Sequence, residues 1–133
     1  MIYFFINLMI HLSVSGIFLF FLIRTAEANA GRKNKRGISF LLPFLFSVFF
    51  LLHGLWNTFP KAADSVAIVK QSYQPIVEGS VEEIGFINNT LKINGVVYFY
   101  NPFAYKPNVG DTIRISTTEY SRYIANLSVV EKK

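Results

Sequence analysis

Two uncharged apolar segments on either side of one basic loop constrain this chain more than any other feature. Residues 2–23 and 38–59 each run for 22 residues without Asp, Glu, Lys or Arg. A helix rises about 1.5 Å per residue, so each segment makes a helix of about 33 Å, enough to cross the ~30 Å hydrocarbon core of a bilayer. The pattern predicts a two-helix transmembrane hairpin over residues 1–59.

The distribution of charged residues predicts the orientation of this hairpin in the membrane. Residues 24–36 hold five Lys or Arg and one Glu, which is most of the net charge of +5. The positive-inside rule places such a short basic loop, here residues 24–37, in the cytoplasm. Both the N-terminus and the chain after residue 59 are then expected outside the cytoplasm. The residues expected to set this topology are Arg24, Arg32, Lys33, Lys35 and Arg36.

The rest of the composition narrows the class of protein. The chain after Pro60 carries eight Lys or Arg against seven Asp or Glu, so we expect no nucleic acid partner. Small-residue motifs at residues 26–30 allow a cleaved signal peptide, but cleavage would export the basic cluster and is disfavoured. The chain has no cysteine. An exported domain without disulfides favours a bacterial plasma membrane over a eukaryotic secretory route.

After a juxtamembrane connector at residues 60–75, for which a helix is favoured over a strand, residues 76–133 show strand patterns. Asn88-Asn89 and Asn94-Gly95 mark turns, and Gly79 and Gly85 mark bulges or bends. Asp111 is expected to accept local backbone hydrogen bonds at a turn. The fold class is membrane α plus small all-β, with an extracytoplasmic antiparallel OB-like β-barrel. Its expected strands are residues 77–87, 91–93, 96–101, 112–117 and 122–130.

Polar side chains within the two apolar segments suggest an intramembrane polar interface. They are Asn7, His11, Ser15, Ser47, His53 and Asn57. The first three are spaced four apart and share one helix face. A hairpin symmetric about the loop puts Asn7 opposite His53, and His11 opposite Phe49 and Phe50. Interhelical hydrogen bonding is favoured over a proton relay, and two histidines without further ligands predict no metal and no cofactor.

Aromatic residues are densest outside the apolar segments at residues 98–105, and they predict a ligand or partner surface. Strand alternation separates Tyr98 and Tyr100 from Val97 and Phe99, so the two tyrosines lie at the surface if Phe99 is in the core. The alternative is that half of these rings fill the core. Adjacent carboxylates at residues 82 and 83 point to opposite faces, and nothing pairs a nucleophile with a base, so no catalytic residue is expected. The full predicted surface is Tyr98, Tyr100, Phe103, Tyr105, Arg114, Arg122 and Tyr123.

The order of features from Glu78-Gly79 through Asn94-Gly95 to Val109-Gly110-Asp111 resembles a minimal OB-type barrel. Together with the hairpin, it resembles NfeD-like membrane proteins and the two-span barrel effectors of bacterial cyclic-nucleotide antiphage systems. The likeness is in span count and barrel alone and transfers no residue, so we claim no family. Those effectors also bind a cytoplasmic nucleotide, whereas the charges here place the barrel outside.

The expected function is that of a non-enzymatic membrane-anchored binding or scaffold protein. It would present its barrel to another envelope or membrane protein, with the hairpin available for homo-oligomer contacts. One alternative is a phage-exclusion or antiphage-defence membrane effector, which fits the small size and the lack of a catalytic set. The other is a small transporter or channel accessory subunit that uses Asn7, His11 and His53.

Overall fold

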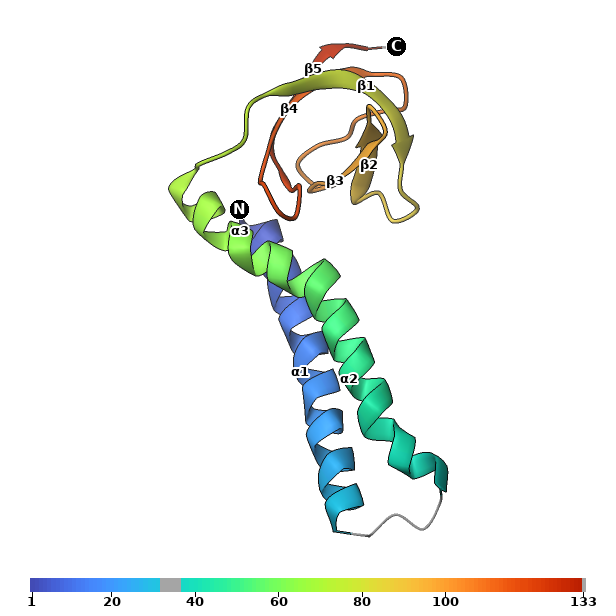
Figure 1. Ribbon diagram of the computed structural model, residues 1–133. Helices are drawn as coiled ribbons and strands as arrows, with labels where there is room; N and C mark the ends of the chain where they lie inside the picture. Colours follow the sequence, from blue (N-terminus) through green and yellow to red (C-terminus); the bar gives the residue numbers. More distant parts are fainter. Residues whose placement is uncertain (32–36, 133) are drawn as a thin grey trace. The chain divides into compact units, whose positions relative to one another are not determined.

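The computed structural model describes residues 1–31 and 37–132, and its first half is helical (Figure 1). Helix α1 spans Ile2–Ala30. A second helical stretch of 34 residues joins a 3₁₀ turn to α2, a π-helical turn and α3. The helix predicted in the connector is confirmed, because α3 continues beyond the predicted span. The segments of the second stretch are Gly37–Leu41 (3₁₀), α2 (Leu42–His53), Gly54–Thr58 (π) and α3 (Phe59–Lys70).

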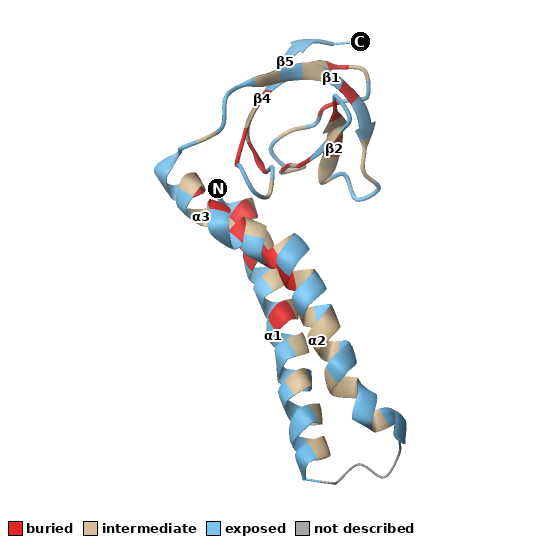
Figure 2. Ribbon diagram, in the orientation of Figure 1, coloured by how far each residue is buried: buried red, intermediate tan, exposed pale blue. Residues whose placement is uncertain are grey.

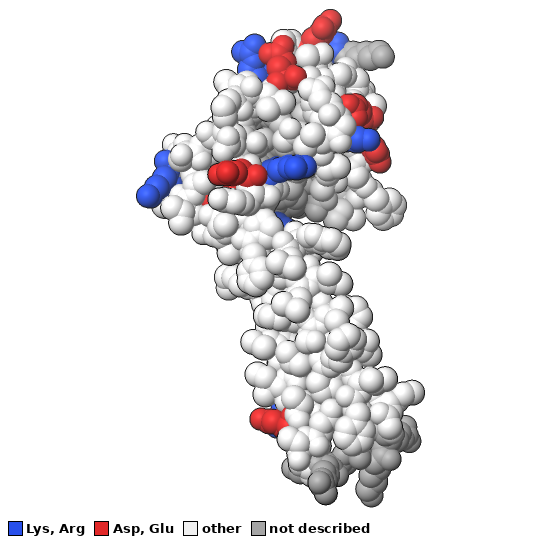
Figure 3. All heavy atoms as spheres, viewed as in Figure 1, with Lys and Arg blue, Asp and Glu red and all other residues white. Residues whose placement is uncertain are grey.

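Both helical stretches are long and apolar enough to cross a membrane, and the protein covers little of either. Only 11% of the most apolar window of α1 is buried, and 6% of that in Gly37–Lys70. Figure 2 shows exposed and half-buried residues along both helical stretches, with few buried ones. A core helix of a soluble domain would be largely covered instead. Between Ile6 and Pro60, the described charged residues are Arg24 and Glu27. Figure 3 shows the surface of the helices as largely uncharged, with charge close to one end.

Five antiparallel strands form one sheet in the order β3-β2-β1-β4-β5. The sheet is open, so the predicted closed barrel is not confirmed. Among the described residues, the edge strands β3 and β5 form no ladder with each other, while Phe99 at the end of β3 and Tyr123 just before β5 form an isolated parallel bridge. The Phe99 amide donates to the Arg122 carbonyl at 3.1 Å. The strands are β1 (Val77–Ile84), β2 (Thr90–Ile93), β3 (Val96–Phe99), β4 (Thr112–Thr117) and β5 (Ile124–Glu131).

Local sequence signals account for much of this sheet. β4 has the bounds predicted from its alternation, with Ile113 and Ile115 buried and Arg114 exposed. Asn94 and Gly95 both have positive φ, 51° and 74°, as the predicted two-residue turn between β2 and β3 requires. The irregularity in β1 falls between Val81 and Glu83, and not at either predicted glycine.

The sheet encloses its own hydrophobic core. Its centre includes Ile93 and Ile113, which are fully buried, together with the tyrosines Tyr98 and Tyr100. The predicted face of β3 is therefore wrong: both tyrosines point inward, while Val97 is exposed. Alternation distinguishes the two faces of a strand, but it does not say which one is covered when both carry apolar side chains.

The chain divides into two compact units. The helical unit is residues 6–60, and the β unit joins residues 1–5 to the chain from Lys61 onward. The first turn of α1 thus belongs with the strands and α3. Each unit has its own set of polar and aromatic contacts.

Candidate functional site

A pocket of about 380 Å³ lies in the β unit beside the loop that follows β3. Two residues of the predicted partner surface, Tyr100 and Tyr105, line it. Lys106 adds a cation, and Asn88 and Asn108 add amide groups. Ile84 from the end of β1 and the loop prolines 102 and 107 complete the wall. We name this hollow the loop pocket.

Hydrogen bonds within the loop give the loop pocket a defined shape. The Asn101 side chain accepts from the Phe103 amide at 3.0 Å, and the Asn101 carbonyl accepts from the Tyr105 amide at 3.1 Å. The Tyr105 hydroxyl donates to the Ala125 carbonyl at 3.2 Å. Asp111 Oδ2 accepts from a loop amide at 2.9 Å, so its predicted turn role is confirmed. Such a preformed wall lowers the entropy lost when a ligand binds.

The electrostatics of the loop pocket suit a neutral or anionic ligand. Burial raises the pKa of Tyr100, and the nearby Tyr3 raises it further, away from neutral pH. A protonated phenol can donate or accept a hydrogen bond. Lys106 is exposed beside it and supplies a positive charge. An aromatic wall with amide and cationic groups can hold a sugar or carboxylate group.

The rest of the predicted partner surface does not gather at this pocket. Arg114 is exposed on β4, and its guanidinium lies 2.8 Å from the Glu78 carboxylate. Arg122 is exposed at a turn with a φ of 52°. Tyr98 is buried on β3, and Tyr123 is buried before β5. Phe103 is exposed in the loop after β3.

Five aromatic rings of the β unit, two of them from the first turn of α1, form one connected cluster. The Tyr3 ring stacks on Phe99 at a centroid distance of 5.7 Å, and its edge contact with Phe103 is at 6.0 Å. Phe99 and Tyr123 lie 5.5 Å apart. Phe4 is fully buried and lies 5.0 Å from Tyr123. Part of the predicted partner surface is thus covered by the chain's own N-terminal residues.

Asp64 of α3 was missed as a site residue in the sequence, yet it is one of the best-bonded side chains in the β unit. It is buried, and its carboxylate accepts from the Tyr120 amide at 3.1 Å and from the Ser121 amide and hydroxyl, both at 2.6 Å. Three positions earlier, buried Lys61 places its ammonium 5.2 Å from the Phe99 ring centroid. No signal in the sequence points to these contacts, because the partners of Asp64 lie 56 and 57 residues away.

In the helical unit, the predicted interhelical polar contacts form, but with a shifted register. His11 Nδ1 lies 3.4 Å from His53 Nε2, so His53 faces His11 and not Asn7. The buried Ser15 and Thr58 hydroxyls share a hydrogen bond of 2.8 Å. Thr58, which the sequence analysis left out, also donates to the His11 carbonyl at 3.4 Å. The predicted depth of His11 is wrong because the hairpin is not symmetric about its loop.

The π-helical turn lets both partners face α1. His53 and Thr58 are five positions apart, which on a regular α-helix would separate them by about 140° around the axis. Hydrogen bonding across five residues widens this turn, as in the bond from the Phe59 amide to the Gly54 carbonyl. His53 and Thr58 then both meet the face of α1 that carries His11 and Ser15, which are four positions apart.

The remaining predicted interface residues behave differently. Ser47 donates to the Phe44 carbonyl of its own helix at 2.7 Å, so this hydrogen bond is local. Asn7 is half-buried, and its Oδ1 is buried without a hydrogen-bond partner. Asn57 is half-buried next to Thr58. The described residues include no group of three or more His, Cys, Asp or Glu that could hold a metal ion.

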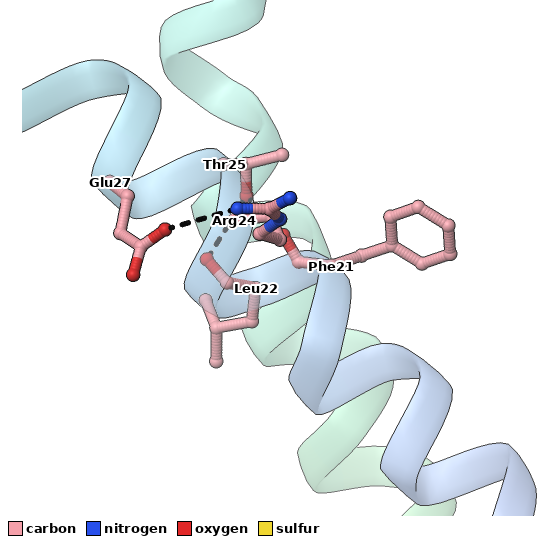
Figure 4. Close-up of polar contacts among 5 residues, drawn as sticks. All are labelled: Phe21, Leu22, Arg24, Thr25 and Glu27. Carbon is pink, nitrogen blue, oxygen red and sulfur yellow. Dashed lines mark hydrogen bonds and ion pairs between the residues drawn. The ribbon is translucent and has the colours of Figure 1, made fainter. Parts of the chain in front are cut away.

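The end of α1 carries the one topology residue that the structure describes. Arg24 is exposed, and its guanidinium lies 3.8 Å from the Glu27 carboxylate one turn later (Figure 4). It also lies 5.8 Å from the Phe20 ring centroid. The Thr25 hydroxyl donates to the Phe21 and Leu22 carbonyls, so its hydrogen bonds stay within its own helix. The other predicted topology residues, Arg32, Lys33, Lys35 and Arg36, lie outside the described residues.

Comparison with known proteins adds no family to this description. No protein-family model matches the chain, and no curated protein and no solved structure is significantly similar to it. The function is therefore argued from the chain's own geometry.

Proposed function

We propose that this chain is a non-enzymatic membrane protein whose β unit binds another component of a bacterial envelope. The observation that carries the proposal is the pairing of two long, uncovered apolar helices with a folded β unit that has a preformed pocket. Apolar helices that the protein leaves uncovered need lipid or a protein partner. A membrane hairpin places these helices in lipid and leaves the β unit outside the hydrocarbon core.

The direction of the hairpin follows from the basic loop. With residues 24–37 in the cytoplasm, the N-terminus and the β unit lie outside it. We further propose that the β unit functions as an OB-like barrel. The parallel bridge between Phe99 and Tyr123 supports this, since it links the end of β3 to the residue just before β5. OB folds are five-stranded and only partly closed.

The loop pocket is the proposed binding site, and Lys106 is the residue that tests it best. Lys106 is exposed at the pocket wall, so its replacement leaves the core intact. A photo-crosslinking amino acid at Lys106 should yield one discrete adduct in intact cells. The same probe at Val130, which is exposed and far along β5, should not. Equal adduct patterns at the two positions would remove the pocket from the proposal.

The side of the membrane is tested separately. Ser128 is exposed, and the native chain has no cysteine, so Ser128→Cys creates a single reactive thiol. A membrane-impermeant thiol reagent should label this variant on intact cells. Labelling only after lysis would place the β unit in the cytoplasm and favour a sensor of a cytoplasmic ligand.

A second candidate function is a small transport or channel accessory subunit, which the contact between His11 and His53 favours. Ionisable groups within apolar spans are costly and often mark pathways. Alanine at both histidines should then abolish ion or proton flux in proteoliposomes while leaving the helices formed. Unchanged flux would leave the pair as a packing contact.

A further inference from the structure

Three large apolar side chains are exposed at two turns of the β unit. Phe86 is fully exposed and Ile87 is 69% exposed, and both lie in the turn between β1 and β2. Phe103 is 85% exposed in the loop after β3. The turn is hydrogen-bonded from the Asn88 amide to the Gly85 carbonyl at 2.8 Å, so these side chains sit on defined backbone. Large apolar residues clustered at turn tips mark a contact with lipid or protein.

Contacts within the β unit tie both turns to the first turn of α1. Tyr3 makes an edge contact with Phe103, and its side chain hydrogen bonds with that of Asn89, which follows the first turn. The Asn89 carbonyl also accepts from the Tyr100 amide at 2.9 Å, which joins the turn to β3. Tyr3 is the second residue of α1. The exposed tips therefore lie beside the point at which α1 begins.

The chemistry of these tips matches the interfacial layer of a bilayer. Residues 84–91 and 93–105 contain no Asp, Glu, Lys or Arg. The first two residues of the chain, Met1 and Ile2, are exposed and apolar as well. Aromatic side chains and uncharged backbone turns are favoured at the boundary between headgroups and acyl chains.

We infer that Phe86, Ile87 and Phe103 insert into the surface of the bilayer that the helices cross, so that the β unit rests on lipid. This inference rests on the proposed membrane hairpin. Its support is continuity: Tyr3, in the first turn of a helix that is uncovered along its apolar length, contacts Phe103 directly and bonds to Asn89, two residues after Ile87. A helix that crosses a membrane is surrounded by lipid, so lipid is the partner that we assign to these exposed side chains.

The test uses the full chain in nanodiscs that contain lipids brominated near the headgroup. Trp56 is the single native tryptophan, so Phe86→Trp and Phe103→Trp are made in a Trp56→Phe background. Val130→Trp is the matched control, because Val130 is exposed and lies six residues along β5 from Ile124, roughly 20 Å away. We expect brominated lipid to quench both tip tryptophans at least about two-fold more strongly than the control.

Quenching of the tip tryptophans equal to that of the control would overturn the inference. A blue-shifted but unquenched tip tryptophan would overturn it too, because protein would then cover the site. The quenching of native Trp56 is also measured in the unaltered chain, because it tests the membrane hairpin independently of the tip residues. If Trp56 is quenched while the tips are not, the hairpin stands and the inference fails. If Trp56 is not quenched either, the membrane hairpin itself is wrong.

Discussion

Replacing Asp64 should uncouple α3 from the turn between β4 and β5. The carboxylate accepts three hydrogen bonds, from the Tyr120 amide and from the Ser121 amide and hydroxyl. A hydrogen bond to a charged group contributes about 1.5–3 kcal/mol, but two of the three share one oxygen and the contributions are not additive. We expect Asp64→Ala to lower the free energy of unfolding by about 3 kcal/mol, since two backbone amides lose their acceptor.

Two further variants separate charge from packing. Asp64→Asn keeps an acceptor for Tyr120 but presents an amide donor to Ser121, so we expect a loss of about 2 kcal/mol. Ser65→Ala is the matched control, because Ser65 bonds only to the Ala62 carbonyl of its own helix. That change should stay within about 0.5 kcal/mol of the parent.

Hydrogen–deuterium exchange of the full chain in detergent gives the most direct assay. Protection at the amides of Tyr120 and Ser121 should fall in both Asp64 variants and stay unchanged in Ser65→Ala. Urea unfolding followed by near-ultraviolet circular dichroism supplies the free energies. If Asp64→Ala matched Ser65→Ala in both measurements, the three hydrogen bonds would not stabilise the protein as argued.

Three other perturbations have defined outcomes. Burial, followed by the neighbouring Tyr105, Tyr3 and Tyr73, raises the pKa of Tyr123 from 10.0 to about 12. The folded chain therefore keeps a proton that the unfolded chain releases above pH 10, and stability should fall by up to about 1.4 kcal/mol per pH unit between pH 10 and 12. Tyr123→Phe should reduce that fall in alkaline unfolding curves, and an unchanged slope would contradict the burial argument. Thr58→Val should lower helix-hairpin stability in mixed micelles by about 0.6 kcal/mol, and a double-mutant cycle with Ser15→Ala that shows no coupling would count against their hydrogen bond. Gly95→Ala should cost about 1–2 kcal/mol in urea, because the φ of 74° is unfavourable for alanine although no atom blocks its Cβ; an unchanged midpoint would refute this.

The sequence predicts elements well where local chemistry decides them. β4 has its predicted bounds because Ile113 and Ile115 alternate with polar residues between two turns. The turn at Asn94 and Gly95 forms because few other residues accept positive φ at two successive positions. Asp111 forms its turn contact within three residues of its own position.

The sequence is a poor guide to features that depend on contacts between segments far apart in the chain. Tyr98 and Tyr100 are buried because the curvature of the sheet, and not their alternation, determines which face becomes the core. Phe4 is buried against Tyr123, and no pattern in either segment points to the other. Strand count suggested a closed barrel, but closure depends on how far the edge strands curl together. The loop pocket was found only in part, through Tyr100 and Tyr105, because its other walls come from separate loops.

The π-helical turn at Gly54–Thr58 also determines how this chain tolerates changes in length. Winding the same five residues as a regular α-helix would turn everything that follows by about 100° around the helix axis. Thr58 would then leave Ser15, and Asp64 would rotate away from the side on which it meets Ser121. Deleting one residue from the turn while restoring α-helical winding would instead keep this alignment, because His53 and Thr58 would then be four positions apart, as His11 and Ser15 are. A deletion within α3 before Asp64 has no such compensation and would turn Asp64 by about 100°. The chain should therefore accept the loss of one residue within Gly54–Thr58 more readily than the loss of one between Thr58 and Asp64.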